Sequence, residues 1–270
     1  MKKTAKRALG MAALYMAAIA PRLFHRPERM PEVYYAHRGL HDNAGDAPEN
    51  TLAAFEKAVR HGYGIELDVQ ATRDGRVVVA HDFNLKRICG VDRDIDTLTY
   101  AELRRYPVFE SGQTIPLFAE ALKLVDGKVP LIVELKYKNG RSRICERTDR
   151  LLRRYPGAYC VESFHPAALC WYRLNRPKVC RGQLSSNFIK HDGQRTPVHY
   201  AMRHLLTNFL TAPDFIAYDC RDPKALSLTL CRNLFDCPSV AWTVKSAAQL
   251  ESCRDFFDYF IFEGFEPGRE

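Results

Sequence analysis

The sequence predicts an α/β protein, a (β/α)8 TIM barrel with an N-terminal apolar helix. After residue 30, short β-branched runs alternate with amphipathic stretches, which is typical of parallel strands joined by helices. The length of that part of the chain matches the roughly 250 residues of such a barrel. A doubly wound open sheet is the alternative, but no glycine-rich dinucleotide loop follows the first predicted strand.

The individual elements follow from composition and spacing. The first predicted barrel helix, 51–62, presents one apolar face and begins at Asn50 or Thr51, both of which suit an N-cap. The predicted strands, which include about eight principal barrel strands, are 32–37, 64–70, 76–82, 129–137, 158–164, 178–184, 214–220, 238–244 and 258–264. The other predicted helices are 99–106, 115–125, 141–155, 166–174, a helix within 198–210, 223–234 and 246–253.

Composition restricts the class of protein and of partner. Hydrophobic residues make up 46% and charged residues 27% of the 270, an ordinary globular balance. The net charge of +8 favours an anionic partner, although a generally basic surface explains it equally well. Lysine and arginine do not cluster with interleaved aromatic residues, which argues against nucleic acid. The oligomeric state is not encoded in any pattern that we recognise.

The cysteine pattern bears on the compartment. The nine cysteines are odd in number and contain no CxxC pair, so a zinc finger or a disulfide scaffold is disfavoured. Scattered cysteines in a chain of this size are typical of reduced thiols. We therefore expect the barrel to lie on the cytoplasmic side of any membrane that the chain contacts.

Residues 1–30 are predicted to form a membrane-associated segment that is separate from the barrel domain, 31–270. Lysines and an arginine precede a mainly apolar run, 8–20, which has the length of a signal-peptide core and is short for a membrane span. An uncleaved anchor, a signal peptide and an amphipathic surface helix all fit this run. Pro21 disfavours cleavage after Ala20, so we expect uncleaved membrane association through residues 8–24.

Three carboxylates predict a metal site. Glu66 and Asp68 share one face of a strand whose other face is apolar, and Glu134 and Lys136 share a face of the strand 129–137. Buried like charges repel and lose hydration, and a divalent cation relieves both costs. Three carboxylates suit Mg²⁺ or Ca²⁺ better than zinc. The alternative is that Lys136 or an arginine simply pairs with these acids.

Two histidines and an arginine follow predicted strands. His37 and His81 end the strands 32–37 and 76–82, and the carboxyl ends of barrel strands are where catalytic groups gather. Two such imidazoles suit general acid and base catalysis, whereas a single one is more often structural. Arg38 adds a group that can bind phosphate through two nitrogens, or that simply lies on the surface.

These residues occur within motifs that have a familiar order. They are AHRG (36–39), APENTLAAF (47–55), IELDVQATRDGRVVVAHD (65–82), IPLFAEAL (115–122), VELK (133–136), ESF (162–164) and AWTV (241–244). Over roughly 33–263, the chain resembles the glycerophosphodiester phosphodiesterase family of (β/α)8 barrels. The resemblance implies metal-dependent hydrolysis of glycerophosphodiesters to sn-glycerol 3-phosphate and an alcohol.

The resemblance also implies roles for individual residues. His37 and His81 correspond to the acid/base pair, and Glu66, Asp68 and Glu134 to the ligands of one divalent cation. The phosphate contacts correspond to Arg38 and Lys136, with Glu49 near the site. Trp242 corresponds to a residue at the pocket mouth, although simple barrel packing would explain it as well. Which histidine is the acid and which is the base is not encoded in the sequence.

Two positions depart from the family pattern, which commonly has Asn after WTV and Asp at the end of the last strand. This chain has Lys245 and Glu263 instead, so the resemblance leaves the leaving alcohol open. The alternative functions are a lysophospholipase D that acts on membrane lipids and a non-catalytic phosphate-binding barrel. No histidine or metal ligand is missing, which disfavours the non-catalytic alternative.

Overall fold

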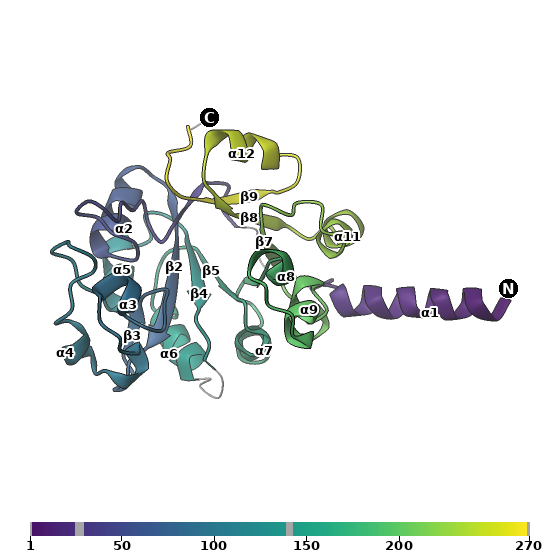
Figure 1. The fold of residues 1–270 in the computed structure, drawn as a ribbon, viewed down its shortest axis with the longest axis horizontal. Coiled ribbons are helices and arrows are strands. Elements are labelled where there is room, and N and C mark those ends of the chain that lie inside the picture. The colour runs from purple at the N-terminus through teal and green to yellow at the C-terminus, as the bar shows by residue number, and fades with distance from the viewer. Residues whose placement is uncertain (1, 25–29, 139–142, 269–270) are drawn as a thin grey trace.

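The computed structural model describes residues 2–24, 30–138 and 143–268, and it confirms the predicted barrel (Figure 1). Eight parallel strands close on themselves in the order β1, β2, β4, β5, β6, β7, β8, β9, because β9 pairs with β1. The strands are β1 (Tyr35–His37), β2 (Gly64–Ala71), β3 (Val77–Val79), β4 (Leu131–Leu135), β5 (Tyr159–Ser163), β6 (Arg181–Ser185), β7 (Phe215–Asp219), β8 (Ser239–Val244) and β9 (Tyr259–Phe262).

Helices surround the barrel in Figure 1, as the alternating pattern predicts. They are α1 (Lys2–Ile19), α2 (Leu52–Arg60), α3 (Lys86–Cys89), α4 (Tyr100–Leu103), α5 (Phe118–Val125), α6 (Arg143–Leu152), α7 (Pro166–Asn175), α8 (Phe188–His191), α9 (Pro197–Arg203), α10 (Asn208–Thr211), α11 (Leu226–Phe235) and α12 (Ala247–Cys253), with a short 3-10 turn, η1 (Ile95–Thr97). Thr51 is the N-cap of α2, and the segment 198–210 contains two helices instead of one.

One predicted barrel strand is not part of the barrel. The segment 76–82 contains β3, which runs antiparallel to the long strand β2, with Val79 opposite Val69. Strand β2 continues past the mouth of the barrel, and β3 returns beside it. His81 therefore follows a strand that runs back toward the barrel, whereas we expected it at the carboxyl end of a parallel barrel strand. Periodicity marks a strand but does not give its direction.

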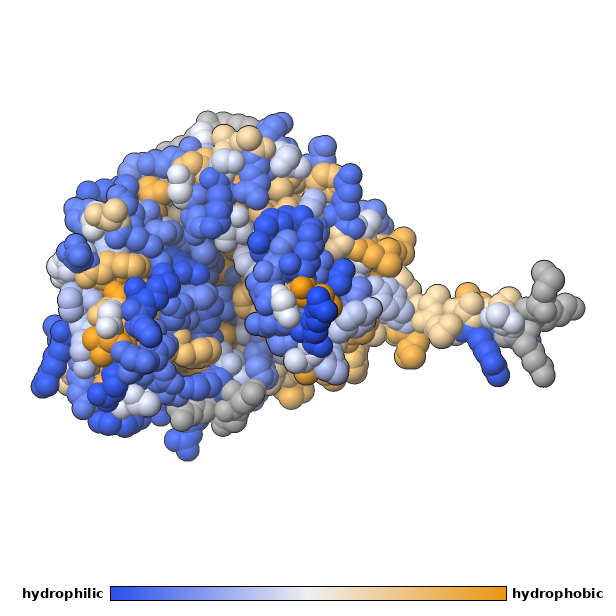
Figure 2. All heavy atoms as spheres, viewed as in Figure 1, coloured by the Kyte–Doolittle hydropathy of each residue, from blue (hydrophilic) through white to orange (hydrophobic). Residues whose placement is uncertain are grey.

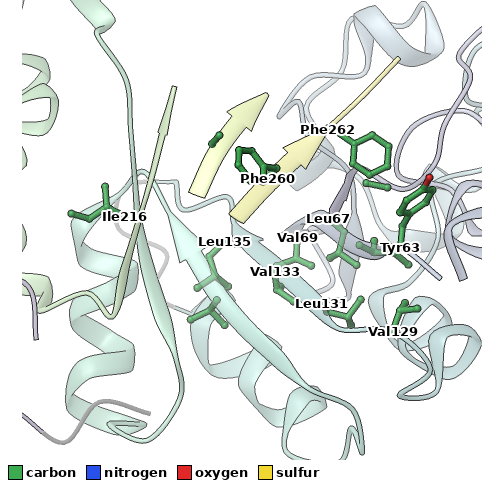
Figure 3. Packing of buried hydrophobic residues seen from close by; sticks show 14 of the residues in the cluster. Tyr63, Leu67, Val69, Val129, Leu131, Val133, Leu135, Ile216, Phe260 and Phe262 are labelled. Atoms are coloured by element: carbon green, nitrogen blue, oxygen red, sulfur yellow. The ribbon is translucent and has the colours of Figure 1, made fainter. Parts of the chain in front are cut away.

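The alternation along β2 decides which side chains face the inside. Leu67 and Val69, with Val133 and Leu135 of β4, pack in the apolar layer between the barrel and its helices (Figure 3). Successive side chains of a strand point to opposite sides, so the residues between these face the barrel interior. The apolar layer thus accounts for the inward direction of the acidic residues on the same strands.

Helix α1 projects from the side of the barrel (Figure 1). Its end is anchored, because Ile19 is fully buried and its carbonyl accepts a hydrogen bond of 2.8 Å from the side chain of Asn208. Further back along the helix, Leu9 and Leu14 are each 73% exposed. No helix in the described part of the chain combines the length and the apolar composition that crossing a membrane requires.

Candidate active site

The register of the barrel places acidic and basic residues of neighbouring strands at one level. His37 lies opposite Glu66, Asp68 opposite Glu134, and Glu134 opposite Glu162. His37, Glu134 and Glu162 are the last or next-to-last residues of β1, β4 and β5, at the end of the barrel where active sites form. Glu66 and Asp68 lie earlier in the longer strand β2, but the register brings them to the same level. A cavity of about 690 Å³ opens there, and Figure 2 shows a hollow surrounded by hydrophilic residues on this face.

The three predicted metal ligands come together. Glu66, Asp68 and Glu134 are buried, and each offers a carboxylate oxygen within 4.8 Å of the others. Burial raises the pKa of Glu66 well above its usual range, and the nearby carboxylates of Asp68 and Glu162 raise it further. Burial and the neighbouring carboxylates thus both disfavour the ionised form of Glu66, and a bound cation would favour it. Three hard oxygen donors so close together fit a divalent cation such as Mg²⁺ or Ca²⁺.

Two cations lie beside the carboxylates. The Lys136 ammonium lies 2.9 Å from Asp68 Oδ1 and 2.8 Å from Glu134 Oε1, and Arg38 Nε lies 3.5 Å from Asp68 Oδ2. Burial raises the pKa of Asp68, but the charges of Lys136, His81 and Arg38 and a hydrogen bond from Asn50 lower it further, so the net pKa is well below its usual range. Arg38 lines the cavity, whereas Lys136 approaches the carboxylates from behind it.

His81 belongs to a chain of charged groups on one side of the cavity. Its Nδ1 lies 2.6 Å from Asp82 Oδ1, and Arg87 donates from Nε to Asp82 Oδ2 at 2.6 Å. The same guanidinium donates to both carboxylate oxygens of Glu49, which also accepts from Arg38 at 2.6 Å. The predicted Glu49 is thus a bridge between two arginines and contacts Arg38, a predicted phosphate ligand.

His37 has a different carboxylate partner. Its Nδ1 lies 2.6 Å from Glu263 Oε2, and its Nε2 lies 3.9 Å from Glu66 Oε2. Burial lowers the pKa of His37 to about 4, even though the Glu263 carboxylate acts in the opposite direction. A neutral imidazole next to an acceptor-only carboxylate carries its proton on Nδ1, so Nε2 keeps a free lone pair on the side of the metal ligands.

The cavity thus contains most of the predicted site. Its walls include both histidines and the predicted positions 38, 49, 66, 134 and 242. Trp242 lies there in edge contact with Phe164, with ring centroids 5.4 Å apart. The distances bring the predicted residues together, but they do not assign a chemical role to any one of them.

Sequence reasoning missed several residues that the site contains. Glu162 is buried, and its Oε2 has no hydrogen-bond partner among the described residues. It lies inside the ESF motif, and its alternation with outward-facing Val161 is a signal that we could have used. Asp82 and Arg87 also escaped notice. Arg87 sits on α3, where no pattern indicates that its side chain turns toward the barrel mouth.

The fold and the site together define a (β/α)8 barrel with a cluster of three buried carboxylates, two histidine–carboxylate pairs and an arginine at one open cavity. The model of the glycerophosphoryl diester phosphodiesterase family matches residues 37–216. The chain therefore belongs to that family.

Individual proteins show the same likeness. A glycerophosphodiester phosphodiesterase of Bacillus altitudinis is 35% identical over 157 residues, which is 54% of this chain and 63% of that protein. Human lysophospholipase D GDPD1 is 39% identical over 120 residues, 43% of this chain and 36% of that protein. The matches thus span less than two thirds of the length of these relatives.

Solved structures support the fold over a larger part of the chain. A phosphodiesterase from Oleispira antarctica, solved in complex with the product sn-glycerol-3-phosphate, covers 87% of this chain with a TM-score of 0.69 and 22% identity. The match includes 93% of that protein. A glycerophosphodiester phosphodiesterase from Thermotoga maritima covers 87% of this chain and 96% of its own, with a TM-score of 0.66 and 21% identity.

Proposed function

We propose that this protein hydrolyses glycerophosphodiesters to sn-glycerol 3-phosphate and an alcohol, in a reaction that depends on one divalent cation. One observation carries the proposal: a cluster of three buried carboxylates lies at a cavity that is lined by Arg38 and by two histidines, each with its Nδ1 held by a carboxylate. Membership of the family supports it, as does the product named for the Oleispira antarctica structure.

Different residues of the chain bind the phosphate group and the cation. Arg38 lines the cavity and offers a planar, permanently charged donor to the phosphate oxygens. Lys136 supplies a second positive charge from behind Asp68 and Glu134. Glu66, Asp68 and Glu134 would hold Mg²⁺ or Ca²⁺, which when bound neutralises negative charge on phosphorus-bound oxygens.

The histidines move the protons. One imidazole takes a proton at Nε2 from the nucleophile, which is water or the glycerol 2-hydroxyl, and the other donates a proton to the leaving alcohol. If the 2-hydroxyl attacks, the first product is a cyclic phosphate, which water then opens to glycerol 3-phosphate with the two imidazoles in exchanged roles. In both, Nδ1 is occupied by a carboxylate, so proton transfer is directed to Nε2. Trp242 and Phe164 touch each other and line the cavity, which supports a contact between these rings and the alcohol.

A substrate panel tests this proposal. The panel contains glycerophosphocholine, glycerophosphoethanolamine, glycerophosphoglycerol and a lysophospholipid, each with Mg²⁺ or Ca²⁺ and with or without a chelator. We expect metal-dependent release of glycerol 3-phosphate, lost in His37→Ala and Glu66→Ala and retained in His61→Ala. His61 is the matched control because it lies outside the cavity and also pairs with a glutamate, Glu266. No turnover by folded, metal-loaded protein would contradict the proposal.

Lysophospholipase D activity is the second candidate. The sequence match to human lysophospholipase D GDPD1 and the exposed apolar residues of α1 favour it. Turnover of the lysophospholipid alone, with no release of glycerol 3-phosphate from the water-soluble diesters, would establish this candidate in place of the first.

We also propose that residues 8–24 attach the protein to a membrane surface. Leu9, Met11, Leu14 and Phe24 are each at least 68% exposed, and the helix carries basic residues near its N-terminus. All nine cysteines are free thiols, which supports a barrel on the cytoplasmic side. We expect the full chain to sediment with vesicles that contain phosphatidylglycerol, and Leu9→Glu/Leu14→Glu to remain in solution. Equal sedimentation of both proteins would contradict this attachment.

A further inference from the structure

At the ends of three neighbouring strands, three polar residues lie in one row at the cavity wall. Ala36 of β1 lies opposite Phe262 of β9, and Phe262 lies opposite Val244 of β8. The residue that follows along the chain is His37 after Ala36, Glu263 after Phe262 and Lys245 after Val244. The three side chains are therefore at the same height because the register of a closed parallel barrel aligns them.

Contacts along this row are short at both steps. Glu263 uses one carboxylate oxygen, Oε2, for His37 Nδ1 at 2.6 Å and the other, Oε1, for Lys245 Nζ at 2.6 Å. Burial raises the pKa of Glu263, but the hydrogen bonds of His37 and Lys245 and the charge of Lys245 outweigh burial and hold the net pKa below its usual range. Glu263 is thus an ionised, acceptor-only group that is fixed from two sides.

We propose that Glu263 and Lys245 form a positioning pair for His37. Glu263 fixes the imidazole with its proton on Nδ1 and its Nε2 toward the metal ligands, and Lys245 keeps the Glu263 carboxylate in the orientation that reaches His37. This inference rests on the proposed function, because it explains how His37 is oriented for proton transfer. It also gives a role to the two positions at which the sequence departs from the family pattern.

A purely structural ion pair explains these contacts less well. The Glu263 backbone N–H already donates to the Val244 carbonyl, so the main chain is anchored without the side chain. Lys245 is 67% exposed at its side chain, and an ion pair so exposed contributes little to the free energy of unfolding. Both residues line the cavity, at the position where a support for a catalytic imidazole is needed.

Steady-state kinetics of Glu263→Gln is the main test. The substitution keeps the size of the side chain but removes the charge that fixes the imidazole tautomer. We expect kcat to fall by roughly 10- to 100-fold with little change in KM, the scale on which partners of functional histidines act. Glu263→Asp, which keeps the carboxylate, should recover part of the loss. The matched control is Glu266→Gln, which removes a glutamate paired with His61 outside the cavity.

A double-mutant cycle separates positioning from a general structural role. If Glu263 acts through His37, then Glu263→Gln should cause no further loss in a His37→Ala background. Equal fold losses in both backgrounds would overturn the proposal. Lys245→Gln should lower kcat less than Glu263→Gln does, and Lys245→Arg should restore it. A larger effect of Lys245→Gln on KM than on kcat would show that the lysine binds substrate, which would overturn its part of the proposal.

An NMR measurement keeps this inference distinct from the proposed function. The imidazole nitrogen shifts of His37 in the ¹⁵N-labelled full chain report which nitrogen carries the proton, whether or not any diester is hydrolysed. We expect the Nδ1–H tautomer in the native protein and a mixture in Glu263→Gln. An unchanged Nδ1–H tautomer would overturn the inference. The expected tautomer change in a protein that hydrolyses no diester would contradict the proposed function alone.

Discussion

The two histidines of the cavity have similar partners but different origins. Each imidazole places Nδ1 2.6 Å from a carboxylate oxygen. The partner of His81 is the next residue, Asp82, and Arg87 completes the group five residues further on. The partner of His37 is Glu263, 226 residues away in the sequence. One pair is therefore encoded locally, and the other exists only when the last strand closes the barrel onto the first.

The difference shows how two parts of the molecule hold a functional group. On the His81 side, orientation comes from consecutive ion pairs, with Arg87 joined to Asp82 and to Glu49. On the His37 side, it comes from strand register, because β1, β8 and β9 lie side by side. Loss of a single ion pair should be tolerated better on the first side than on the second, where Glu263 is the only described carboxylate at His37 Nδ1.

The largest expected effect is the loss of either imidazole. Positioned acid and base groups typically contribute about 10²–10⁴-fold to a rate. We expect His37→Ala and His81→Ala each to lower kcat by an amount in this range, measured with glycerophosphocholine at saturating metal. An unaltered kcat in either variant would remove that histidine from the mechanism and end the comparison.

The stability of the protein in acid tests the ion pairs that join Asp82, Arg87 and Glu49 beside His81. Burial raises the pKa of Glu49, but hydrogen bonds from Arg87 and the charge of Arg38 outweigh burial and lower the net pKa to about 2. In the unfolded chain the pKa of a glutamate is about 4.3, so between about pH 2 and pH 4.3 the unfolded state binds more protons than the folded state. The stabilisation of the fold by the ionised Glu49 is therefore fully present above about pH 4.3 and is lost as the pH falls through about 2.

Glu49→Gln should therefore be less stable than the native protein by about 2–3 kcal/mol at pH 7, measured by urea denaturation. The difference in the free energy of unfolding between the two proteins should become smaller as the pH approaches 2. Glu56→Gln is the control because Glu56 forms an exposed ion pair with Arg60 on α2. A difference that stays constant from pH 7 to pH 2 would show that the charge of Glu49 does not stabilise this network.

The smallest effect sharpens the difference between the two pairs. Asp82→Asn leaves Arg87 bound to Glu49, so part of the support on this side remains. We expect kcat to fall about 10-fold, the lower limit for the partner of a functional histidine, and less than in Glu263→Gln. The two variants are compared in one assay with equal metal. A greater loss in Asp82→Asn would reverse the ranking that the structure implies.

The barrel fold and the carboxylate cluster could be predicted from the sequence, for reasons that can be traced to particular residues. The alternation along β2 and β4 predicted that Glu66, Asp68 and Glu134 face the barrel interior, because apolar residues that face outward occupy the positions between the polar ones. The direction of β3 could not be predicted from its apolar run, since a parallel strand and a returning one have the same period.

The histidine–carboxylate pairs, His81 with Asp82 and His37 with Glu263, were harder to predict from the sequence. Asp82 follows His81 directly, yet adjacent residues of a strand point to opposite sides, so their contact depends on a chain that has already left the strand. Glu263 and Lys245 were noticed only as departures from a family pattern. Their meeting at His37 depends on barrel closure and register, which no local pattern encodes.

The most direct test of the account concerns the division between acid and base. The activities of His37→Ala and His81→Ala are compared on glycerophosphocholine and on the p-nitrophenyl ester of glycerol 3-phosphate, whose leaving group needs no proton. The account predicts that the aryl ester restores most of the activity of one variant, which identifies the acid, and not that of the other, which identifies the base. Equal losses on both substrates in both variants would contradict the acid and base pair.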